Sequence, residues 1–285
     1  MPELPEVETM VRGIRETMSG RILKKLELVP CECKPITIEP TLGRIRKRIE
    51  GTRIHSVERF AKRVVIRHET GDRLVIEPRM TGLMLLDDPP DPDHLRLKWT
   101  LSGRQRPHQV WFWDRRGLAT CRLYSEKQWD QWLASGKMGP DALLMQADAW
   151  RERIQSSTRA VKVAMLDQST VAGIGNLYAS EILHLSRVHP ETRCKQLTRA
   201  QIETIASHTK SILHEAIRYE GSTLSDGTYR NALNKAGGFQ NQHRVYAKEG
   251  ELCPTCQTET VKRIVQAQRS TFFCPLCQSK RRRKS

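Results

Sequence analysis

The sequence lacks any long hydrophobic run and has few aromatic residues. Phe, Trp and Tyr make up 6% of its 285 residues, and no stretch approaches the roughly 18 consecutive apolar residues that a membrane-spanning helix requires. The first eight residues, MPELPEVE, are acidic and contain no apolar core, so they do not resemble a secretory signal. We therefore predict no membrane partner, and a cytosolic or nucleoid-associated location.

Acidic residues are also in deficit. Lys and Arg number 48 against 32 Asp and Glu, so the formal net charge is +16. Such an excess favours polyanionic partners, and nucleic acid is the leading candidate because basic residues occur throughout the chain. The basic run Lys280–Lys284 has two open interpretations, a tail that contacts DNA and a solvated end.

The 285 residues are enough for two domains and a small appendage, and the apolar residues, 38% of the chain, suffice for hydrophobic cores. Residues 7–18 repeat apolar side chains at steps of three and four, which predicts a helix that Gly20 ends. Short β-branched runs separated by turn residues fill 21–124 and predict a β-sandwich or barrel. From residue 126 the texture becomes helical, and 221–250 is predicted to be mostly loop. Helical segments are expected at 141–145, 148–154, 161–166, 177–185 and 198–219.

Pro2 follows Met1 directly and is flanked by carboxylates. If Met1 is removed, Pro2 becomes a free secondary amine, which titrates near pH 8 and is partly neutral and nucleophilic at physiological pH. Such an amine can attack a sugar C1′ carbon and form an iminium ion, with Glu3 as a proton donor or acceptor. A structural interpretation stays open, in which Pro5 opens a helix and Glu6 favours its positive end.

Four of the eight cysteines form two Cys-x2-Cys pairs separated by 17 residues. This spacing can place four sulfurs at the corners of a tetrahedron and predicts one structural Zn²⁺. Disulfides are the alternative, which a reducing compartment disfavours. The predicted zinc ligands are Cys253, Cys256, Cys274 and Cys277, whereas Cys31, Cys33, Cys121 and Cys194 are expected to be free thiols.

Three other features could bind phosphate, each with a plainer alternative. Arg269 lies on the predicted exposed tip between the cysteine pairs, where it could grip a phosphate or simply be solvated. Gly175 and Asn176 open a predicted helix, which suits anion binding, although such glycines also serve helix packing. Lys162, among apolar neighbours, could reach across a cleft or extend its head to water.

Three segments, in this order, resemble the bacterial formamidopyrimidine-DNA glycosylase family, which is related to endonuclease VIII. They are MPELPEVE at the start, LDQ at 166–168 continuing to GIGNLYASEIL at 173–183, and QRSTFFC at 268–274. The resemblance spans nearly the whole chain. It implies an α+β protein with an N-terminal β-sandwich and leading helix, a central helix–two-turn–helix domain and a C-terminal four-cysteine zinc finger.

The resemblance also implies domain boundaries. These are 1–125 for the catalytic β-sandwich, 126–220 for the helix–two-turn–helix DNA-binding domain, 221–250 for the lesion-recognition loop and linker, and 251–285 for the zinc finger and basic tail.

The implied activity is that of a base-excision-repair DNA glycosylase with AP lyase activity. It would act as a monomer on double-stranded DNA containing oxidised bases, removing 8-oxoguanine and formamidopyrimidines. Excision would proceed through a Schiff base on Pro2, followed by β,δ-elimination. By the same resemblance, the catalytic residues would be Pro2, Glu3, Lys62 and Arg269, supported by Glu6 and Lys162. The DNA-binding residues would be Gly175, Asn176, and the three that fill the hole left by the extruded base: Met80, Arg116 and Leu118.

The chain departs from the family pattern in three places. Glu77 stands where the family usually has a phosphate-binding histidine, and Leu118 stands where it usually has phenylalanine. The zinc spacing is one residue longer than is typical of the family. These departures motivate an alternative function, a damaged-DNA-binding zinc protein without catalysis. A general zinc-containing nucleic-acid binder is a third possibility.

Overall fold

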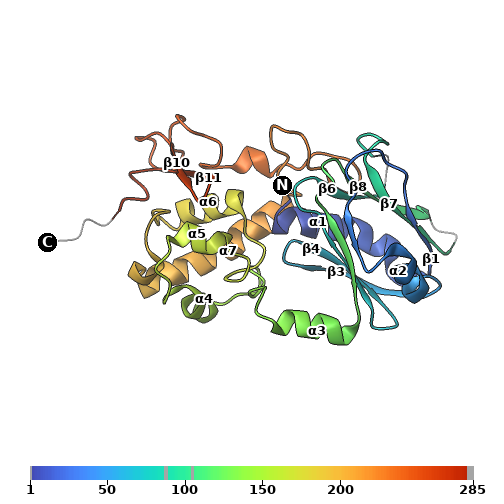
Figure 1. Cartoon of the computed structure of the whole chain (residues 1–285). Coiled ribbons are helices and arrows are strands. Elements are labelled where there is room, and N and C mark those ends of the chain that lie inside the picture. Colours follow the sequence, from blue (N-terminus) through green and yellow to red (C-terminus); the bar gives the residue numbers. More distant parts are fainter. Residues whose placement is uncertain (1, 87–88, 104–105, 281–285) are drawn as a thin grey trace. The chain divides into compact units, whose positions relative to one another are not determined.

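The computed structural model describes residues 2–86, 89–103 and 106–280. The chain folds into two compact units (Figure 1). Unit 1 comprises Met1–Ser135 and Ala216–Gln240, and unit 2 comprises Gly136–Glu215 and Asn241–Ser285. Of the basic run at 280–284, only Lys280 lies within the described residues, and its ammonium pairs with the carboxylate of Glu191.

The strands of unit 1 form two sheets. The four-stranded sheet has the order β1-β7-β8-β6, and the five-stranded sheet the order β2-β9-β5-β4-β3. Neighbouring strands are antiparallel except β2 and β9, which are parallel. The strands are β1 (Leu23–Leu28), β2 (Thr37–Glu39), β3 (Ile54–Phe60), β4 (Arg63–His68), β5 (Arg73–Glu77), β6 (Gly82–Leu85), β7 (Leu95–Leu101), β8 (Gln109–Asp114) and β9 (Thr120–Tyr124).

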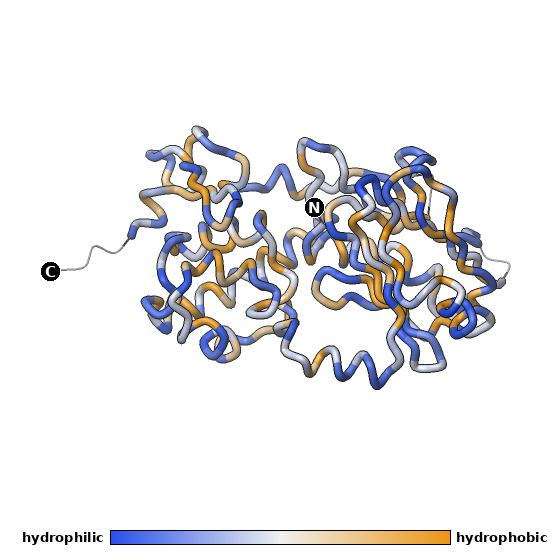
Figure 2. The backbone as a smooth tube through the Cα atoms, viewed as in Figure 1, coloured by the Kyte–Doolittle hydropathy of each residue, from blue (hydrophilic) through white to orange (hydrophobic). Residues whose placement is uncertain are grey.

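Both sheets contribute to one hydrophobic core, which confirms the predicted β-sandwich. Ile66 and Ile76 of the five-stranded sheet belong to the same buried cluster as Trp99 and Phe112 of the four-stranded sheet. In Figure 2 hydrophobic segments run along the strands of unit 1. Strands β4 and β5 are buried on both faces, because Val65 and Val75 pack with Trp129 in a second, smaller cluster.

Helix α1 (Leu4–Met18) packs on β3, β4 and β6 of this sandwich. Its predicted apolar face is fully buried and consists of Val7, Met10, Val11, Ile14 and Met18. Burying one side chain of this size contributes about 1.5–3 kcal/mol, so this face accounts for the docking of the helix. Gly20 follows with φ +80°, a left-handed conformation that breaks the helix as expected.

Two short helices complete unit 1. Helix α2 (Leu42–Ile49) lies in a region predicted to contain only strands, and that prediction was wrong there. Only Ile45 and Ile49 of α2 are buried, so its apolar stripe is too narrow to appear as a helical period. Helix α3 (Glu126–Ala134) begins after Ser125, whose hydroxyl accepts a hydrogen bond from the backbone N–H of Gln128.

Unit 2 contains the helices predicted from periodicity. They are α4 (Ala147–Ile154), α5 (Val161–Leu166), α6 (Asn176–Leu185) and α7 (Arg199–Arg218), whose last residues belong to unit 1. Residues 141–145 form a turn and not the expected helical segment. There the carboxylate of Asp141 accepts the backbone N–H of Leu143, a local bond that competes with helix formation.

The C-terminal module of unit 2 contains a hairpin of β10 (Lys262–Gln266) and β11 (Arg269–Phe273). Two short 3₁₀ helices, η1 (Cys194–Gln196) and η2 (Phe239–Gln242), lie in the connecting segments. Among the described residues, no helix is both long enough and apolar enough to cross a membrane.

Candidate functional site

The start of α1 holds the predicted nucleophile and its two carboxylates. Pro2 is buried, and Glu3 and Glu6 are 4% and 2% exposed. Glu3 is the N-cap of the helix and accepts the backbone N–H of Glu6, while the Glu6 carboxylate accepts the backbone N–H of Glu3 at 2.8 Å. This reciprocal capping box fixes the backbone next to Pro2. Pro5 is the second residue of the helix and not its first, while Glu6 lies in the first turn as expected. The structural interpretation of this segment is therefore correct in outline and compatible with the catalytic one.

Glu6 also holds the segment predicted to recognise the lesion. Its second carboxylate oxygen accepts the backbone N–H of Ser222 at 2.9 Å. Gly221 has φ +79°, and a Cβ there would lie 2.8 Å from the same Glu6 oxygen, so the close approach requires glycine. One carboxylate therefore joins the helix start to residues 221–222.

Thr223 and Tyr229 organise the rest of this segment. The Thr223 hydroxyl donates to the carbonyl of Tyr229 at 2.7 Å and accepts the backbone N–H of Gly237 at 2.9 Å. The Tyr229 hydroxyl donates to the Glu220 carbonyl at 3.0 Å. Burial, and after it the charge of Glu6, raise the pKa of Tyr229 well above its usual value, so it remains a neutral donor. The segment is mostly irregular, as predicted, but it is held by specific bonds.

Lys62 lies in the tight turn between β3 and β4, next to Ala61, which has φ +53°. It is half-buried and belongs to the turn rather than to a strand surface. The departure at Glu77 lies at the end of β5, where the carboxylate accepts from the guanidinium of Arg63 at 2.9 Å and from that of Arg79 at 3.1 Å. Two cations thus share one carboxylate, which offsets the repulsion that Glu77 alone would exert on a phosphate.

Met80, Arg116 and Leu118 lie in two turns at one end of the four-stranded sheet. Arg116 is exposed, whereas Met80 and Leu118 are half-buried. The turns are neighbours because Gly82, at the start of β6, pairs with Asp114, at the end of β8. The structure therefore brings together the three side chains predicted to fill the vacated hole.

In unit 2, Lys162 is fully buried and connects two phosphate-binding candidates. Its ammonium donates to Asn176 Oδ1 at 2.8 Å, to Thr271 Oγ1 at 2.8 Å and to the Ser270 carbonyl at 3.2 Å. Asn176 Nδ2 donates to the Ser270 carbonyl at 2.9 Å. Neither of the expected orientations, across a cleft or toward water, describes this side chain. It links α5, the start of α6 and the β10–β11 hairpin.

Gly175 and Asn176 lie where the glycine motif predicted them, at the start of a helix. Gly175 is the N-cap of α6 and Asn176 its first residue. The preceding turn is held by Gln168, which accepts the backbone N–H of Gly173 at 2.9 Å and donates to the Ile174 carbonyl at 2.9 Å. The start of a ten-residue helix carries a partial positive charge that favours an anion.

Arg269 is the first residue of β11 and is exposed. The tip of the hairpin consists of Ala267 and Gln268, with φ +46° and φ +60°. Two left-handed residues in a two-residue loop indicate a tight turn whose twist matches the strands. The segment 266–271 was predicted to be an exposed tip. This is confirmed for Ala267, Gln268 and Arg269, whereas Gln266 and Thr271 are buried. The tight turn fixes the backbone from which Arg269 projects.

The four cysteines of the two Cys-x2-Cys pairs converge. Their sulfurs all lie within 4.8 Å of one another. The Sγ–Sγ distance is 3.9 Å for Cys253 and Cys277, and 3.7 Å for Cys256 and Cys274. A tetrahedron with Zn–S bonds of 2.3 Å has edges of about 3.8 Å, so the cluster fits one Zn²⁺ with all four positions closed. The zinc would hold the module together and would supply no chemistry to a substrate.

Two buried residues with structural roles were not singled out from the sequence. Glu181 is fully buried and accepts the backbone N–H groups of Arg244, Val245 and Tyr246 at 2.8–2.9 Å. His184 contacts Thr255 at 2.9 Å within the zinc module, and burial lowers its pKa. The sequence signal that could have identified them is the presence of Glu181 and His184 within the otherwise mostly apolar run 177–185.

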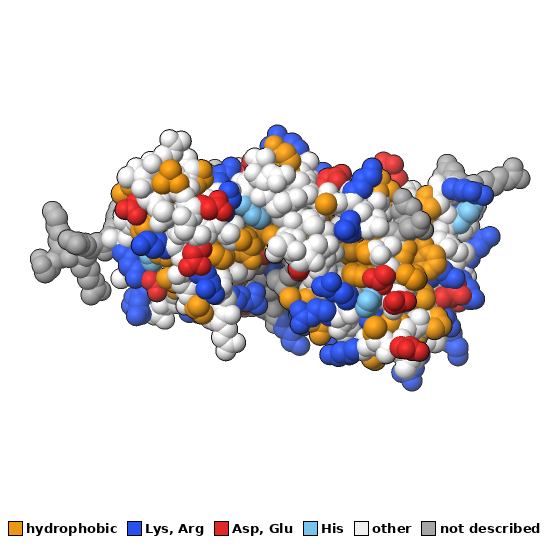
Figure 3. Space-filling model, turned by 90° about the horizontal axis from the view of Figure 1, so that it is seen from above, with side chains coloured by type: hydrophobic (Ala, Val, Ile, Leu, Met, Phe, Trp, Pro, Cys, Tyr) orange, Lys and Arg blue, Asp and Glu red, His pale blue; other side chains and the backbone are white. Residues whose placement is uncertain are grey.

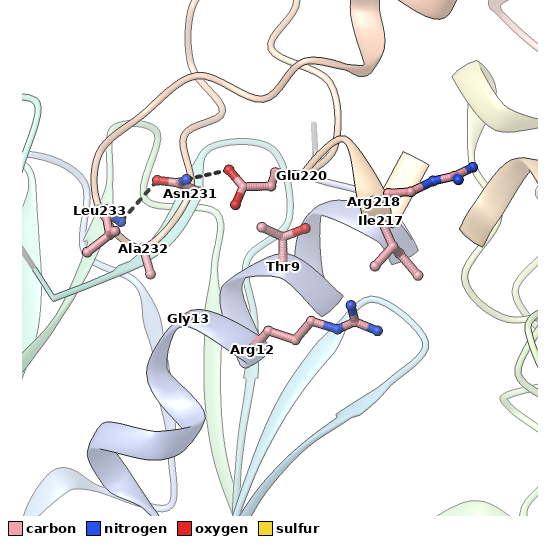
Figure 4. Close-up of a pocket in the computed structure, with 9 residues that line it drawn as sticks. All are labelled: Thr9, Arg12, Gly13, Ile217, Arg218, Glu220, Asn231, Ala232 and Leu233. Atoms are coloured by element: carbon pink, nitrogen blue, oxygen red, sulfur yellow. Dashed lines mark hydrogen bonds between the residues drawn. The ribbon is translucent and has the colours of Figure 1, made fainter. Parts of the chain in front are cut away.

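A pocket of about 500 Å³ lies beside α1 (Figure 4). Thr9, Arg12 and Gly13 form one side of it, and Asn231, which is hydrogen-bonded to Glu220, lies on another. None of the predicted catalytic residues lines this pocket, so it is not the predicted reaction centre. On the face shown in Figure 3, basic side chains are widely distributed and interspersed with acidic ones.

The fold and the site features define a class of protein. It combines an N-terminal β-sandwich led by a helix with Pro2 at its start, a helix–two-turn–helix region and a hairpin closed by four cysteines. Family models agree with each part: the formamidopyrimidine-DNA glycosylase N-terminal domain matches residues 1–121, the formamidopyrimidine-DNA glycosylase H2TH domain matches 138–228, and the zinc finger found in FPG and IleRS matches 259–280.

Similarity to individual proteins extends over the whole chain. Formamidopyrimidine-DNA glycosylase of Lactococcus lactis subsp. lactis is 35% identical over 286 residues, which cover 98% of this chain and 100% of the relative. That of Chloroflexus aurantiacus is 36% identical over 284 residues, covering 98% of each. Two solved complexes, that of a single-residue mutant of L. lactis FPG with Fapy-dG-containing DNA and that of L. lactis Fpg with abasic-site DNA, both have a TM-score of 0.86. They are 31% and 30% identical and cover 98% of this chain and 100% of theirs. The chain belongs to the formamidopyrimidine-DNA glycosylase family.

Proposed function

We propose that this protein is a base-excision-repair DNA glycosylase with AP lyase activity. Its substrates are oxidised purines, 8-oxoguanine and formamidopyrimidines, in duplex DNA. The observation that carries the proposal is the full-length match to family members, one of which has been crystallised with Fapy-dG-containing and with abasic-site DNA. The buried Pro2 beside Glu3 and Glu6 supports the same chemistry.

In this proposal, the Pro2 nitrogen, freed by removal of Met1, attacks C1′ of the damaged nucleotide. The bond between C1′ and the base breaks, the amine loses its proton and the departing base takes up a proton. The C1′–O4′ bond of the sugar ring then opens, O4′ accepts a proton that Glu3 helps to transfer, and the nitrogen lone pair forms the C1′=N bond. The resulting iminium ion is permanently cationic because the amine is secondary. It withdraws electrons and makes the C2′ hydrogen acidic, so the 3′ phosphate and then the 5′ phosphate are eliminated.

The remaining residues would deliver the nucleotide to Pro2. A base inside a duplex is unreachable, so it must be extruded at a cost of a few kcal/mol. Lys62, Asn176 and Arg269 would hold the flanking phosphates, with Gly175 giving the phosphate access to the helix amides. Glu6 and Lys162 would support the site through the bonds described above. Met80, Arg116 and Leu118 would fill the vacated hole.

We propose further that the protein acts as a monomer and associates with the nucleoid of a bacterial cell. The net charge of +16 supports persistent attraction to DNA. One structural Zn²⁺ bound by Cys253, Cys256, Cys274 and Cys277 would hold the hairpin that presents Arg269.

Borohydride trapping on duplex DNA with an abasic site tests this proposal. Reduction of the Schiff base should give a covalent protein–DNA adduct, detected by its slower migration in a denaturing gel and mapped by mass spectrometry to Pro2. The adduct should be lost in Pro2→Gly and in protein that retains Met1. Pro5→Ala is the matched control, because it alters a nearby proline that has only a helical role, and it should trap normally.

The alternative is a damage-binding protein without catalysis, which the departures at Glu77 and Leu118 motivate. The departure at Glu77 weighs less because its carboxylate is paired with Arg63 and Arg79, which offsets its repulsion of a phosphate. Specific binding to lesion-containing DNA with no adduct and no strand cleavage would select it. Equal binding to lesion-bearing and intact duplexes would instead favour a general nucleic-acid binder.

A further inference from the structure

Met80, Arg116 and Leu118, called here the insertion ridge, share a buried anchor. The anchor is the carboxylate of Asp114, which is fully buried at the end of β8. One oxygen accepts the backbone N–H groups of Leu118 and Ala119, both at 2.9 Å. The other accepts the backbone N–H of Arg116 at 3.2 Å. A single side chain thus fixes the turn that carries two of the three ridge residues.

Thr81 joins the second turn to the same anchor. Its hydroxyl, in a side chain that is 3% exposed, donates to the Asp114 carboxylate. It also accepts the backbone N–H of Arg116 at 3.1 Å. Because Thr81 directly follows Met80, this hydroxyl sets the position of Met80 relative to Arg116. Hydrogen bonds to an ionised carboxylate are stronger than those between neutral groups.

Two glycines beside the anchor allow close approach of neighbouring backbone. A Cβ at Gly117, which has φ +57°, would lie 2.0 Å from the carbonyl oxygen of Lys34. A Cβ at Gly82 would lie 2.7 Å from the backbone of Pro78. Each turn therefore passes so close to neighbouring backbone at its glycine that no side chain fits there.

We propose that Asp114 and Thr81 are positioning residues for base extrusion. They hold the insertion ridge in one conformation before DNA binds, so that two apolar side chains and a guanidinium enter the base stack together. This inference rests on the proposed function. Without the anchor, the turns would have to be ordered during insertion, and that loss of conformational freedom would add to the barrier for extrusion.

The test is single-turnover excision of 8-oxoguanine by the full-length protein from two substrates. In one duplex the lesion is paired with cytosine, and in the other it lies in an unpaired bulge, where extrusion is already largely complete. Thr81→Val, which replaces the hydroxyl with a methyl group, should slow excision from the paired duplex about tenfold, the effect of losing one hydrogen bond to a charged group. On the bulge the loss should be at most about twofold.

Two further variants complete the design. Thr81→Ser retains the hydroxyl and should restore the rate on paired DNA. Thr52→Val is the matched control, because Thr52 also has a doubly bonded hydroxyl in unit 1, to the Ile49 carbonyl and to His68, but contacts no ridge residue. It should leave both rates unchanged. Thermal melting establishes that each variant is folded at the assay temperature.

The outcomes separate the alternatives. Equal slowing of Thr81→Val on both substrates would overturn the inference, because the effect would then be on the chemical step. An unchanged rate on paired DNA would also overturn it. A wild-type protein that excises from neither substrate would refute the proposed function itself, and this inference with it.

Discussion

Replacing Lys162 by methionine distinguishes a positioning role from a direct phosphate contact. The ammonium is fully buried and donates three hydrogen bonds, to Asn176, Ser270 and Thr271. Methionine has a similar length and no donor. The Ser270 carbonyl keeps its bond from Asn176 Nδ2, so two acceptors, Asn176 Oδ1 and Thr271 Oγ1, lose a partner.

The expected cost follows from that count. Each buried acceptor left unsatisfied costs about 1–3 kcal/mol, and removing a buried charge returns part of this, so we expect Lys162→Met to destabilise the protein by about 2 kcal/mol. The loss of the bond to Asn176 Oδ1 and the loosened hairpin should also weaken DNA binding about tenfold, about 1.4 kcal/mol.

A salt titration of DNA affinity separates the two roles. If Lys162 only positions its neighbours, Lys162→Met and the wild type should have the same slope of log K for DNA binding against the log of the salt concentration. A direct phosphate contact would reduce the slope by about 1. Lys210→Met is the matched control, since Lys210 donates to Gln146 in the same unit and its loss should alter neither stability nor slope. A variant of wild-type stability with a reduced slope would refute the positioning role.

Three further predictions concern the metal, pH and charge. Chelation of zinc, or the substitution Cys256→Ser, should make the segment after residue 250 sensitive to limited proteolysis while residues 1–135 stay protected. If the segment after residue 250 also stays protected, its fold does not depend on a metal. Burial lowers the pKa of His68 from 6.5 to about 4. The fold therefore favours the neutral ring, and this contribution to stability is complete above pH 6.5 and is lost as the pH falls toward 4. The free energy of unfolding should therefore fall by up to about 3 kcal/mol as the pH drops from 6.5 to 4. Guanidinium unfolding at pH 7 and at pH 4.5 measures this fall, which should be smaller in His68→Gln than in the wild type. Glu77→Gln removes the negative charge that Arg63 and Arg79 share and should strengthen binding to DNA about three- to fivefold at low salt. Weaker binding would show that the charge of Glu77 is needed to hold the two guanidinium groups.

The sequence predicted the parts of the fold that follow from periodicity and spacing. Helix α1 and the strands of the sandwich were predicted because one face of each is apolar. The zinc cluster was predicted because Cys-x2-Cys pairs constrain geometry locally. Helix α2 was missed because only two of its residues are buried, and the helical segment expected at 141–145 was wrong because the Asp141 side chain competes for the backbone.

The site residues came from the resemblance, but their connections did not. Nothing in the spacing of Lys162, Asn176 and Ser270 indicates that one ammonium joins a helix start to a hairpin about a hundred residues away. The double role of Glu6, bonded to Glu3 and Ser222, is equally invisible in sequence. Contacts between residues far apart in the chain depend on tertiary packing, which a local pattern cannot encode.

The interleaved connectivity of the two units has a consequence for how the protein is made. Tyr229 and Ala232 belong to the core of the sandwich, and Ala232 lies against Gly13 and accepts a backbone bond from Leu86. During synthesis, the ribosome completes all of α4–α6 before these two residues are added. The N-terminal sheets must therefore wait with an unfinished core until translation passes residue 240. A truncated message ending near residue 135 would yield a fragment that lacks Tyr229 and Ala232 and leaves uncovered the part of the apolar core that these two residues contact.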